Sequence, residues 1–229
     1  MIDLSVTLVT DSGQSESAGR ALVDTVAEAV AGGVTAVQLR EKHGDARRSL
    51  ELLDALAQRL PERIPVLVND RVDVFLAARL RGIRIAGIHI GQDDLPLETA
   101  RTLVGPEAVI GLTTSSAEEV DRAAASAARA DYLGIGTVRE TRSKVDAPPP
   151  LGIPGVAALA ERAARSGIPA VAIGGIVADD LPLLRERGLA GAAVVSWVCA
   201  APDPRAAAAA LAAAWRTPAP NTNPWKGTK

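Results

Sequence analysis

Short runs of β-branched and other apolar residues recur along the chain and alternate with longer segments of helical character. Eight such runs predict β-strands, at 4–10, 36–40, 65–69, 86–91, 109–113, 132–136, 170–173 and 191–196. The segments between and after them predict helices, at 18–31, 45–59, 72–80, 97–104, 117–129, 154–166, 179–187 and 204–215. Strand and helix therefore alternate eight times.

This alternation predicts an α/β fold, namely a single (β/α)8 TIM barrel. Strands that alternate with helices pair in parallel through right-handed crossovers, and eight such units close into a barrel. The length of 229 residues fits this fold, which typically takes roughly 250 residues. A doubly wound open sheet is the alternative, but no GxGxxG follows the first strand.

Two segments interrupt the alternation. The segment 139–152 contains three consecutive prolines and predicts a long loop after the sixth strand, at the end of the barrel where active sites lie. The segment 217–229 is rich in Pro, Asn, Thr and Gly, and we expect a disordered tail there. The predicted domain therefore spans residues 1–216.

Composition and charge exclude several classes of partner. Apolar residues make up 48% of the chain and aromatic residues only 2%, so the core must be built from Ala, Val, Leu and Ile. A formal net charge of -2 provides no field to attract nucleic acid or anionic lipid. No stretch is long and apolar enough for a membrane helix, and no charged leader precedes an apolar run. We expect a cytoplasmic protein without nucleic-acid or membrane partners, which could form a homo-oligomer.

Cysteine and histidine are too scarce for a metal cluster. Cys199 is the single cysteine, so an intramolecular disulfide is impossible and a reducing compartment is expected. The two histidines are His43 and His89, and we interpret His89 as a hydrogen-bonded residue of the fourth strand.

A cluster of long polar side chains ends the second predicted strand. The segment from Gln38 to Lys42 reads QLREK. Alternation along a strand puts Gln38, Arg40 and Lys42 on one side, with the first two pointing into the barrel mouth. Burying the cations Arg40 and Lys42 is costly unless an anion such as a diphosphate pairs with them. A solvated charge cluster, with Glu41 pairing locally, is the alternative.

Carboxylates follow the next two predicted strands. Asn69 and Asp70 end the third strand, and Asp93 and Asp94 come directly after the fourth. Mg²⁺ favours few carboxylates together with substrate phosphate oxygens, which this spacing permits. Alternatively, one residue of the Asp93-Asp94 pair caps the helix that begins near Pro96.

The last two predicted strands are followed by residues suited to a phosphate. Gly174 and Gly175 follow the seventh strand, and Val195 and Ser196 close the eighth. Loops at these positions of a barrel often bind phosphate through backbone N–H groups. Paired glycines can also be simple turn residues. Together with the basic and acidic clusters, they indicate a site for two phosphorylated ligands and one metal.

The order of these clusters resembles that of thiamine-phosphate synthases, from Thr7 to Pro204. The matching segments are VQLREK, VNDRVD, GIHIGQDD, YLGIGTVRETRSK, VAIGGI and AVVS. The resemblance implies an Mg²⁺-dependent transferase. It would join 4-amino-5-hydroxymethyl-2-methylpyrimidine diphosphate to 4-methyl-5-(2-hydroxyethyl)thiazole phosphate, giving thiamine phosphate and pyrophosphate.

The resemblance also implies roles for individual residues. The pyrimidine diphosphate side would comprise Gln38, Leu39, Arg40, Glu41, Lys42, Asn69, Thr113 and Lys144. The thiazole phosphate side would comprise Thr141, Arg142, Ser143, Gly175, Val195 and Ser196. Asp70 and Asp94 would hold Mg²⁺, while Arg40, Lys42 and Lys144 would act as catalytic groups by neutralising the departing pyrophosphate. The thiazole nitrogen has no proton to lose, so no general base is needed.

The resemblance is incomplete around the loop after the sixth strand. The usual GPxxPTxTK reads GTVRETRSK here, so Thr137 and Glu140 stand where prolines are common and Ser143 replaces a threonine. Trp197 stands beside the phosphate-binding pair where a small residue is common. We therefore expect Trp197 to narrow that pocket.

Three other functions compete with synthesis. A thiazole tautomerase would need neither Mg²⁺ nor a diphosphate, and the retained VNDR and HIGQDD segments argue against it. A non-catalytic thiazole-phosphate sensor would keep the phosphate pockets and lack turnover. An aldolase-type barrel would use Lys42 or Lys144 as a Schiff base, which requires a desolvated lysine rather than one among anion-binding groups.

Overall fold

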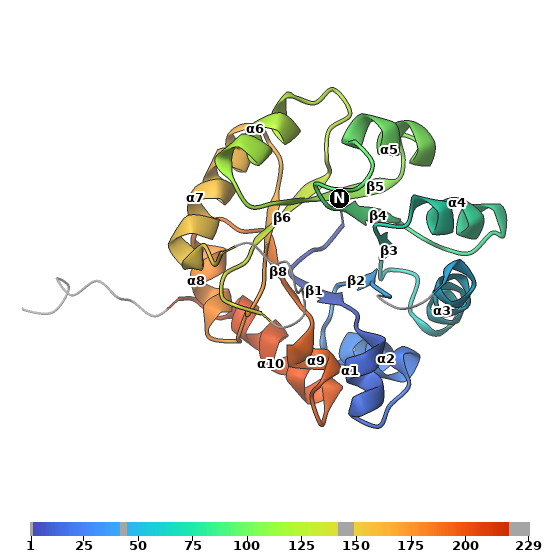
Figure 1. Ribbon diagram of the computed structural model, residues 1–229. Coiled ribbons are helices and arrows are strands. Elements are labelled where there is room, and N and C mark those ends of the chain that lie inside the picture. Colours follow the sequence, from blue (N-terminus) through green and yellow to red (C-terminus); the bar gives the residue numbers. More distant parts are fainter. Residues whose placement is uncertain (1, 42–44, 142–148, 220–229) are drawn as a thin grey trace, which may run out of the picture.

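The computed structural model describes residues 2–41, 45–141 and 149–219, and it shows a closed barrel of eight parallel strands surrounded by helices (Figure 1). The strands are β1 (Val6–Val9), β2 (Ala36–Leu39), β3 (Val66–Asn69), β4 (Gly87–Ile90), β5 (Val109–Thr114), β6 (Tyr132–Gly136), β7 (Ala170–Ile173) and β8 (Gly191–Val194). The helices are α1 (Ser12–Ser17), α2 (Leu22–Gly32), α3 (Ala46–Arg59), α4 (Val72–Leu80), α5 (Leu97–Val104), α6 (Ala117–Ala125), α7 (Gly152–Arg165), α8 (Asp180–Glu186), α9 (Ser196–Cys199) and α10 (Pro204–Arg216). Each strand pairs with its neighbours in sequence, and β8 closes the ring on β1.

The predicted (β/α)8 TIM barrel is confirmed, with corrections to individual elements. Two short helices, α1 and α9, were not predicted, because six and four residues are too few to display helical periodicity. The strand predicted to reach Ser196 ends at Val194, since Ser196 already begins α9. The helix predicted from residue 18 begins at Leu22, and the one predicted to reach residue 129 ends at Ala125. Helix α10 ends at Arg216, while 220–229 of the expected tail lies outside the described residues.

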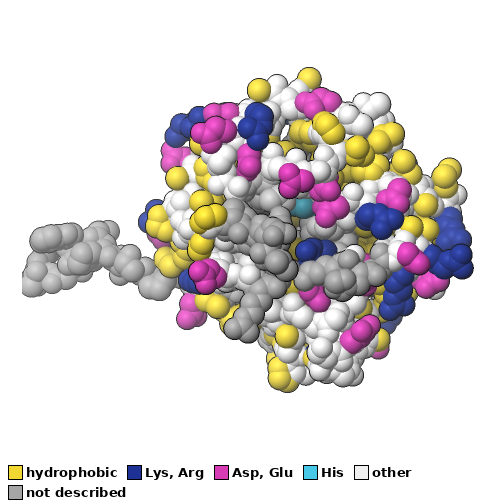
Figure 2. All heavy atoms as spheres, viewed as in Figure 1, with side chains coloured by type: hydrophobic (Ala, Val, Ile, Leu, Met, Phe, Trp, Pro, Cys, Tyr) yellow, Lys and Arg dark blue, Asp and Glu magenta, His cyan; other side chains and the backbone are white. Residues whose placement is uncertain are grey.

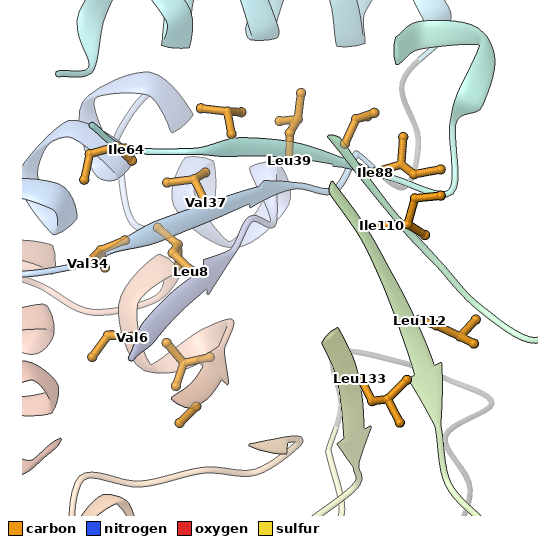
Figure 3. Close-up of a cluster of buried hydrophobic side chains, with 14 of the residues drawn as sticks. Val6, Leu8, Val34, Val37, Leu39, Ile64, Ile88, Ile110, Leu112 and Leu133 are labelled. Carbon is orange, nitrogen blue, oxygen red and sulfur yellow. The ribbon is translucent and has the colours of Figure 1, made fainter. Parts of the chain in front are cut away.

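Two hydrophobic layers hold the barrel together. The larger lies between the strands and the helices, and Figure 3 shows its aliphatic side chains on the strands, including Val6, Leu8, Val37 and Leu39. A smaller cluster, which contains Val9 and residues from five other strands, includes Tyr132. Val6 and Leu8 thus belong to one layer and Val9 to the other, as the side-chain alternation of a strand requires.

The register brings the carboxyl ends of the strands to one rim. Val9 pairs with Gln38, Asn69 pairs with His89, and Ile173 pairs with Ala193. Side chains at or just beyond these positions therefore face the same opening. Across the described part of the chain, no helix has the length and apolarity needed to span a membrane.

Candidate active site

A cavity of about 560 Å³ opens at this rim, and all eight strand ends contribute to its wall. Its volume lies within the range of small-molecule sites. Ten of the predicted site residues line it: Gln38, Arg40, Asn69, Asp70, Asp94, Thr113, Thr141, Gly175, Val195 and Ser196. In Figure 2, acidic side chains gather around the centre of the viewed face, where a histidine is visible.

The remaining predicted residues do not contribute to the described cavity wall. Leu39 is buried in the layer between strands and helices, and Glu41 accepts a hydrogen bond from the Ser12 hydroxyl. The structure therefore does not bring these two side chains to the cavity. Lys42, Arg142, Ser143 and Lys144 lie outside the described residues.

Thr10 fixes the backbone at the end of β2. Its amide N–H donates to the Gln38 carbonyl at 3.0 Å, and its hydroxyl accepts from the Arg40 N–H at 2.9 Å. The same hydroxyl lies 3.2 Å from the Arg40 carbonyl, to which it donates. These bonds continue the β1–β2 pairing beyond the strands and hold Gln38 and Arg40 at the cavity wall.

A chain of polar side chains crosses the barrel beneath the cavity. The phenol of Tyr132 contacts the Gln38 side chain and lies 2.9 Å from His89 Nδ1. His89 Nε2 lies 2.9 Å from the Thr113 hydroxyl. Burial raises the pKa of Tyr132, so the phenol stays protonated and available for hydrogen bonding. The interpretation of His89 as a hydrogen-bonded strand residue is confirmed, and Tyr132 is a member that the sequence analysis missed.

Glycine makes room for this chain. A Cβ atom on Gly111 would lie 2.3 Å from His89 Nδ1 and 2.3 Å from Tyr132 Cζ. A Cβ atom on Gly134 would lie 3.0 Å from His89 Cε1. Packing therefore requires glycine at 111, while a side chain at 134 would be tight against the His89 ring. Small residues on these adjacent strands were the available signal that large polar side chains share the interior.

The backbone orients the predicted metal-binding carboxylates. Asp70 has φ 63°, a left-handed conformation that Asp tolerates, and its N–H donates to the His89 carbonyl at 2.8 Å. Asp94 Oδ2 accepts the Gly91 N–H at 2.7 Å. Pro96 occupies the N-cap of α5 without a side-chain capping bond, so the alternative that Asp93 or Asp94 caps this helix is wrong.

The cavity carries an excess of negative charge within the described residues. Asp70, Asp93, Asp94 and Glu119 line it, against Arg40 as the one Lys or Arg side chain among the described lining residues. No group of three or more His, Cys, Asp or Glu side chains forms a metal cluster among the residues described. Two carboxylates on neighbouring strand ends, completed by phosphate oxygens, nevertheless fit the donor set that Mg²⁺ prefers.

Glycines shape the opposite side of the cavity. Gly174 and Gly175 have φ 94° and 65°, conformations open mainly to glycine, and both line the cavity with Ile176. Within the described residues, neither the Gly175 N–H nor the Ile176 N–H donates a hydrogen bond. Trp197 also lines the cavity, and its Nε1 donates to the Ala207 carbonyl at 3.2 Å. That Trp197 narrows the phosphate pocket stays a prediction.

This barrel places a pair of carboxylates and a glycine-rich turn on different sides of one cavity at the carboxyl ends of its strands, an arrangement typical of an enzyme that acts on small molecules. Comparison with known proteins identifies the family. The model of the thiamine monophosphate synthase family matches residues 6–198, and the chain belongs to this family.

Individual relatives agree with this assignment. The chain is 44% identical over 202 residues to the thiamine-phosphate synthase of Corynebacterium efficiens, covering 88% of this chain and 90% of that protein. It is also 44% identical over 210 residues to that of Azorhizobium caulinodans, covering 91% and 93%. The solved structure of thiamine phosphate pyrophosphorylase from Pyrococcus furiosus superposes with a TM-score of 0.79 at 34% identity, covering 93% of this chain and 95% of that chain. The resemblance and the transferase class are thereby confirmed, and these comparisons support neither the tautomerase nor the sensor.

Proposed function

We propose that this barrel condenses the pyrimidine diphosphate with the thiazole phosphate to form thiamine phosphate and pyrophosphate. The observation that carries the proposal is one cavity with two chemically different sides. The β2 to β5 side offers an amide, a guanidinium, carboxylates and a hydroxyl, while the β7 to β8 side offers a glycine-rich backbone. Two phosphorylated substrates can therefore meet between them.

The β2 to β5 side suits the pyrimidine diphosphate. The Gln38 amide contacts Tyr132, and the Thr113 hydroxyl is hydrogen-bonded to His89, so these buried contacts orient both groups before a ligand arrives. Both can form directional hydrogen bonds with the polar edge of a pyrimidine. We assign the diphosphate to Arg40 and Asn69 at the rim, with Lys42 and Lys144 as further cations.

The charge of the cavity supports a requirement for Mg²⁺. Among the described lining residues one guanidinium stands against four carboxylates, so this part of the wall cannot neutralise a diphosphate by itself. We propose that Asp70 and Asp94 hold the ion. When bound, Mg²⁺ supplies positive charge to the diphosphate as it departs.

The reaction needs a leaving group and a nucleophile, but no proton transfer. The bond between the pyrimidine methylene carbon and the diphosphate oxygen breaks, and its electron pair leaves with pyrophosphate. The lone pair of the thiazole nitrogen then forms the new carbon–nitrogen bond. Arg40 stabilises the growing charge on the leaving oxygen. His89 contacts Tyr132 and Thr113 through its two ring nitrogens, which suits a positioning role rather than that of a base.

The β7 to β8 side suits the single phosphate of the thiazole. Gly175, Val195 and Ser196 are the residues we assign to it, together with Thr141 and the undescribed Arg142 and Ser143. Backbone N–H groups that are not engaged elsewhere are good phosphate donors. Cytoplasmic location and a homo-oligomeric state stay predictions.

An end-point assay with both phosphorylated substrates and Mg²⁺ tests the proposed function. Thiamine phosphate would be followed by chromatography and pyrophosphate by a coupled reaction, with EDTA as the control. Equal amounts of the two products, abolished by EDTA, are expected. Binding of the thiazole phosphate without any product would instead favour a sensor, and isomerisation of a thiazole carboxylate phosphate would favour a tautomerase.

A further inference from the structure

Arg139 forms a bidentate ion pair with Asp180, across 41 positions of sequence, beside the β7 side of the cavity. Arg139 Nη1 lies 2.5 Å from Asp180 Oδ2, and Nη2 lies 2.7 Å from Oδ1. The carboxylate is 5% exposed and the guanidinium side chain 48% exposed. Arg139 belongs to the segment GTVRETRSK, whose departures from the family pattern the reaction does not explain.

The same guanidinium also holds the glycine turn. Arg139 Nη1 donates to the Gly175 carbonyl at 3.1 Å, and the Arg139 N–H donates to the Gly174 carbonyl at 3.0 Å. Asp180 Oδ2 in turn accepts the Val177 N–H at 2.9 Å. The turn from Gly174 to Val177 is therefore fixed on one side by Arg139 and on the other by Asp180.

Close packing leaves the turn no room to move toward this pair. A Cβ atom on Gly175 would lie 2.7 Å from Arg139 Cβ and 3.1 Å from the Glu140 carbonyl oxygen. A Cβ atom on Gly174 would lie 2.6 Å from Thr137 Cβ. The backbones after β6 and β7 thus touch directly, and only glycine permits that approach.

The contact also sets the direction of the backbone donors. In a trans peptide the carbonyl and the following N–H point in opposite directions. When Arg139 holds the Gly175 carbonyl, the Ile176 N–H of the same peptide faces away from Arg139. Two successive glycines would otherwise sample many conformations, and ordering them at the moment of binding would weaken affinity.

We propose that Arg139 and Asp180 are positioning residues that preorganise the Gly174–Val177 turn for the phosphate of the thiazole substrate. This inference rests on the proposed function, because it takes the thiazole phosphate as the ligand of that turn. Neither residue needs to touch the substrate. The expected signature is a selective loss of affinity for one substrate.

Arg139→Gln, Asp180→Asn and the double variant test the inference. In each single variant KM for the thiazole phosphate should rise about tenfold, while kcat and KM for the pyrimidine diphosphate change by less than about twofold. The double variant should also show about a tenfold rise rather than a hundredfold one, because both residues act through one contact. Arg139→Lys, which keeps the charge but loses the bidentate geometry, should lie between wild type and Arg139→Gln.

Arg162→Gln is the matched control. Arg162 forms a bidentate ion pair with Asp121 between α7 and α6, and neither residue lines the cavity. Its loss should leave both KM values unchanged, and thermal melts of all variants would separate loss of stability from loss of affinity. Equal effects on kcat and both KM values, or no change beyond that of Arg162→Gln, would overturn the inference.

Calorimetric titration with the thiazole phosphate separates this inference from the proposed function. Binding by the wild type, weakened about tenfold in Arg139→Gln, supports the positioning role even if turnover is absent. Turnover by the wild type with equal thiazole-phosphate affinity in Arg139→Gln would leave the proposed function standing and refute the positioning role. A wild type that neither binds nor turns over would refute both.

Discussion

Replacing Asp70 by Asn removes one charge from the proposed Mg²⁺ site with little disturbance of the fold. The left-handed φ of 63° makes Ala a poor choice, since a left-handed conformation costs a residue with a Cβ roughly 1–2 kcal/mol. Asn tolerates this conformation almost as well as Asp. The Asp70 side chain is exposed, and its backbone bond to the His89 carbonyl is kept in the variant. We expect a loss of under about 1 kcal/mol, which lowers Tm by no more than about 2–4 °C in a chain of this size.

The effect of Asp70→Asn on kcat should be far larger than its effect on stability. Loss of a group that stabilises charge in the transition state typically costs on the order of 10²–10³ in kcat. The described part of the cavity wall has one cation against four carboxylates, so that part offers little positive charge in place of the ion. Initial rates of pyrophosphate release, measured over a range of Mg²⁺ concentrations, should show both a lower maximum and a higher Mg²⁺ requirement.

Asp93→Asn and Asp94→Asn complete the experiment. Both residues line the cavity, but only Asp94 is oriented by a bond from the Gly91 N–H. We expect Asp94→Asn to resemble Asp70→Asn, while Asp93→Asn keeps activity within a few fold. Full activity with an unchanged Mg²⁺ dependence in Asp70→Asn would refute the metal assignment, and loss of activity in Asp93→Asn alone would transfer the ligand role to Asp93.

Three further predictions follow from the buried groups. Gly111→Ala would force a Cβ to within 2.3 Å of His89 Nδ1 and Tyr132 Cζ. This variant should lower the free energy of unfolding, measured in urea, by about 1–3 kcal/mol. Gly13→Ala is the control and should leave this free energy unchanged, because its Cβ would meet its nearest atom at 3.6 Å. Equal stability of the two variants would show that the barrel interior can relax around the added Cβ. Burial raises the pKa of Tyr132 above the ordinary tyrosine value of 10.0. The stability linked to its proton is therefore complete below pH 10 and is lost above it, at about 1.4 kcal/mol per pH unit. Tyr132→Phe should reduce the alkaline slope of the unfolding free energy, and an identical slope would contradict the buried phenol. Burial also raises the pKa of Cys199 to about 11, so a thiol reagent at neutral pH should label the native protein far more slowly than the unfolded one; equal rates would contradict its burial.

The barrel could be predicted from the sequence because its signals are local. Each strand reads as a short apolar run, and each long helix shows its own periodicity. The two short helices α1 and α9 were not predicted, because each contains less than two turns and is too short to show a helical period. Asp11 accepts a hydrogen bond from the Gln14 N–H and caps α1, which is a signal that local reasoning could have used.

The rim of the site was predictable to the extent that strand ends define it. Gln38 and Asn69 were placed by position along their strands and Thr113 by the family resemblance, and all three line the cavity. The contact between Gln38 and Tyr132 joins β2 to β6 on different parts of the ring, so it depends on barrel closure and not on spacing along the chain. The pairing of Arg139 with Asp180 is equally non-local.

The division of the core explains why this polar chain can exist inside a stable barrel. A TIM-barrel interior is usually filled with bulky branched side chains. Here the interior around His89 and Tyr132 contains Gly111 and Gly134, while the larger aliphatic cluster lies between strands and helices. Hydrophobic burial is therefore concentrated in the outer layer, and the top of the interior is left to hydrogen-bonding side chains that reach the cavity. It follows that truncating an outer-layer residue such as Leu8 should mainly lower stability, whereas altering the His89 chain should change substrate binding before it unfolds the protein.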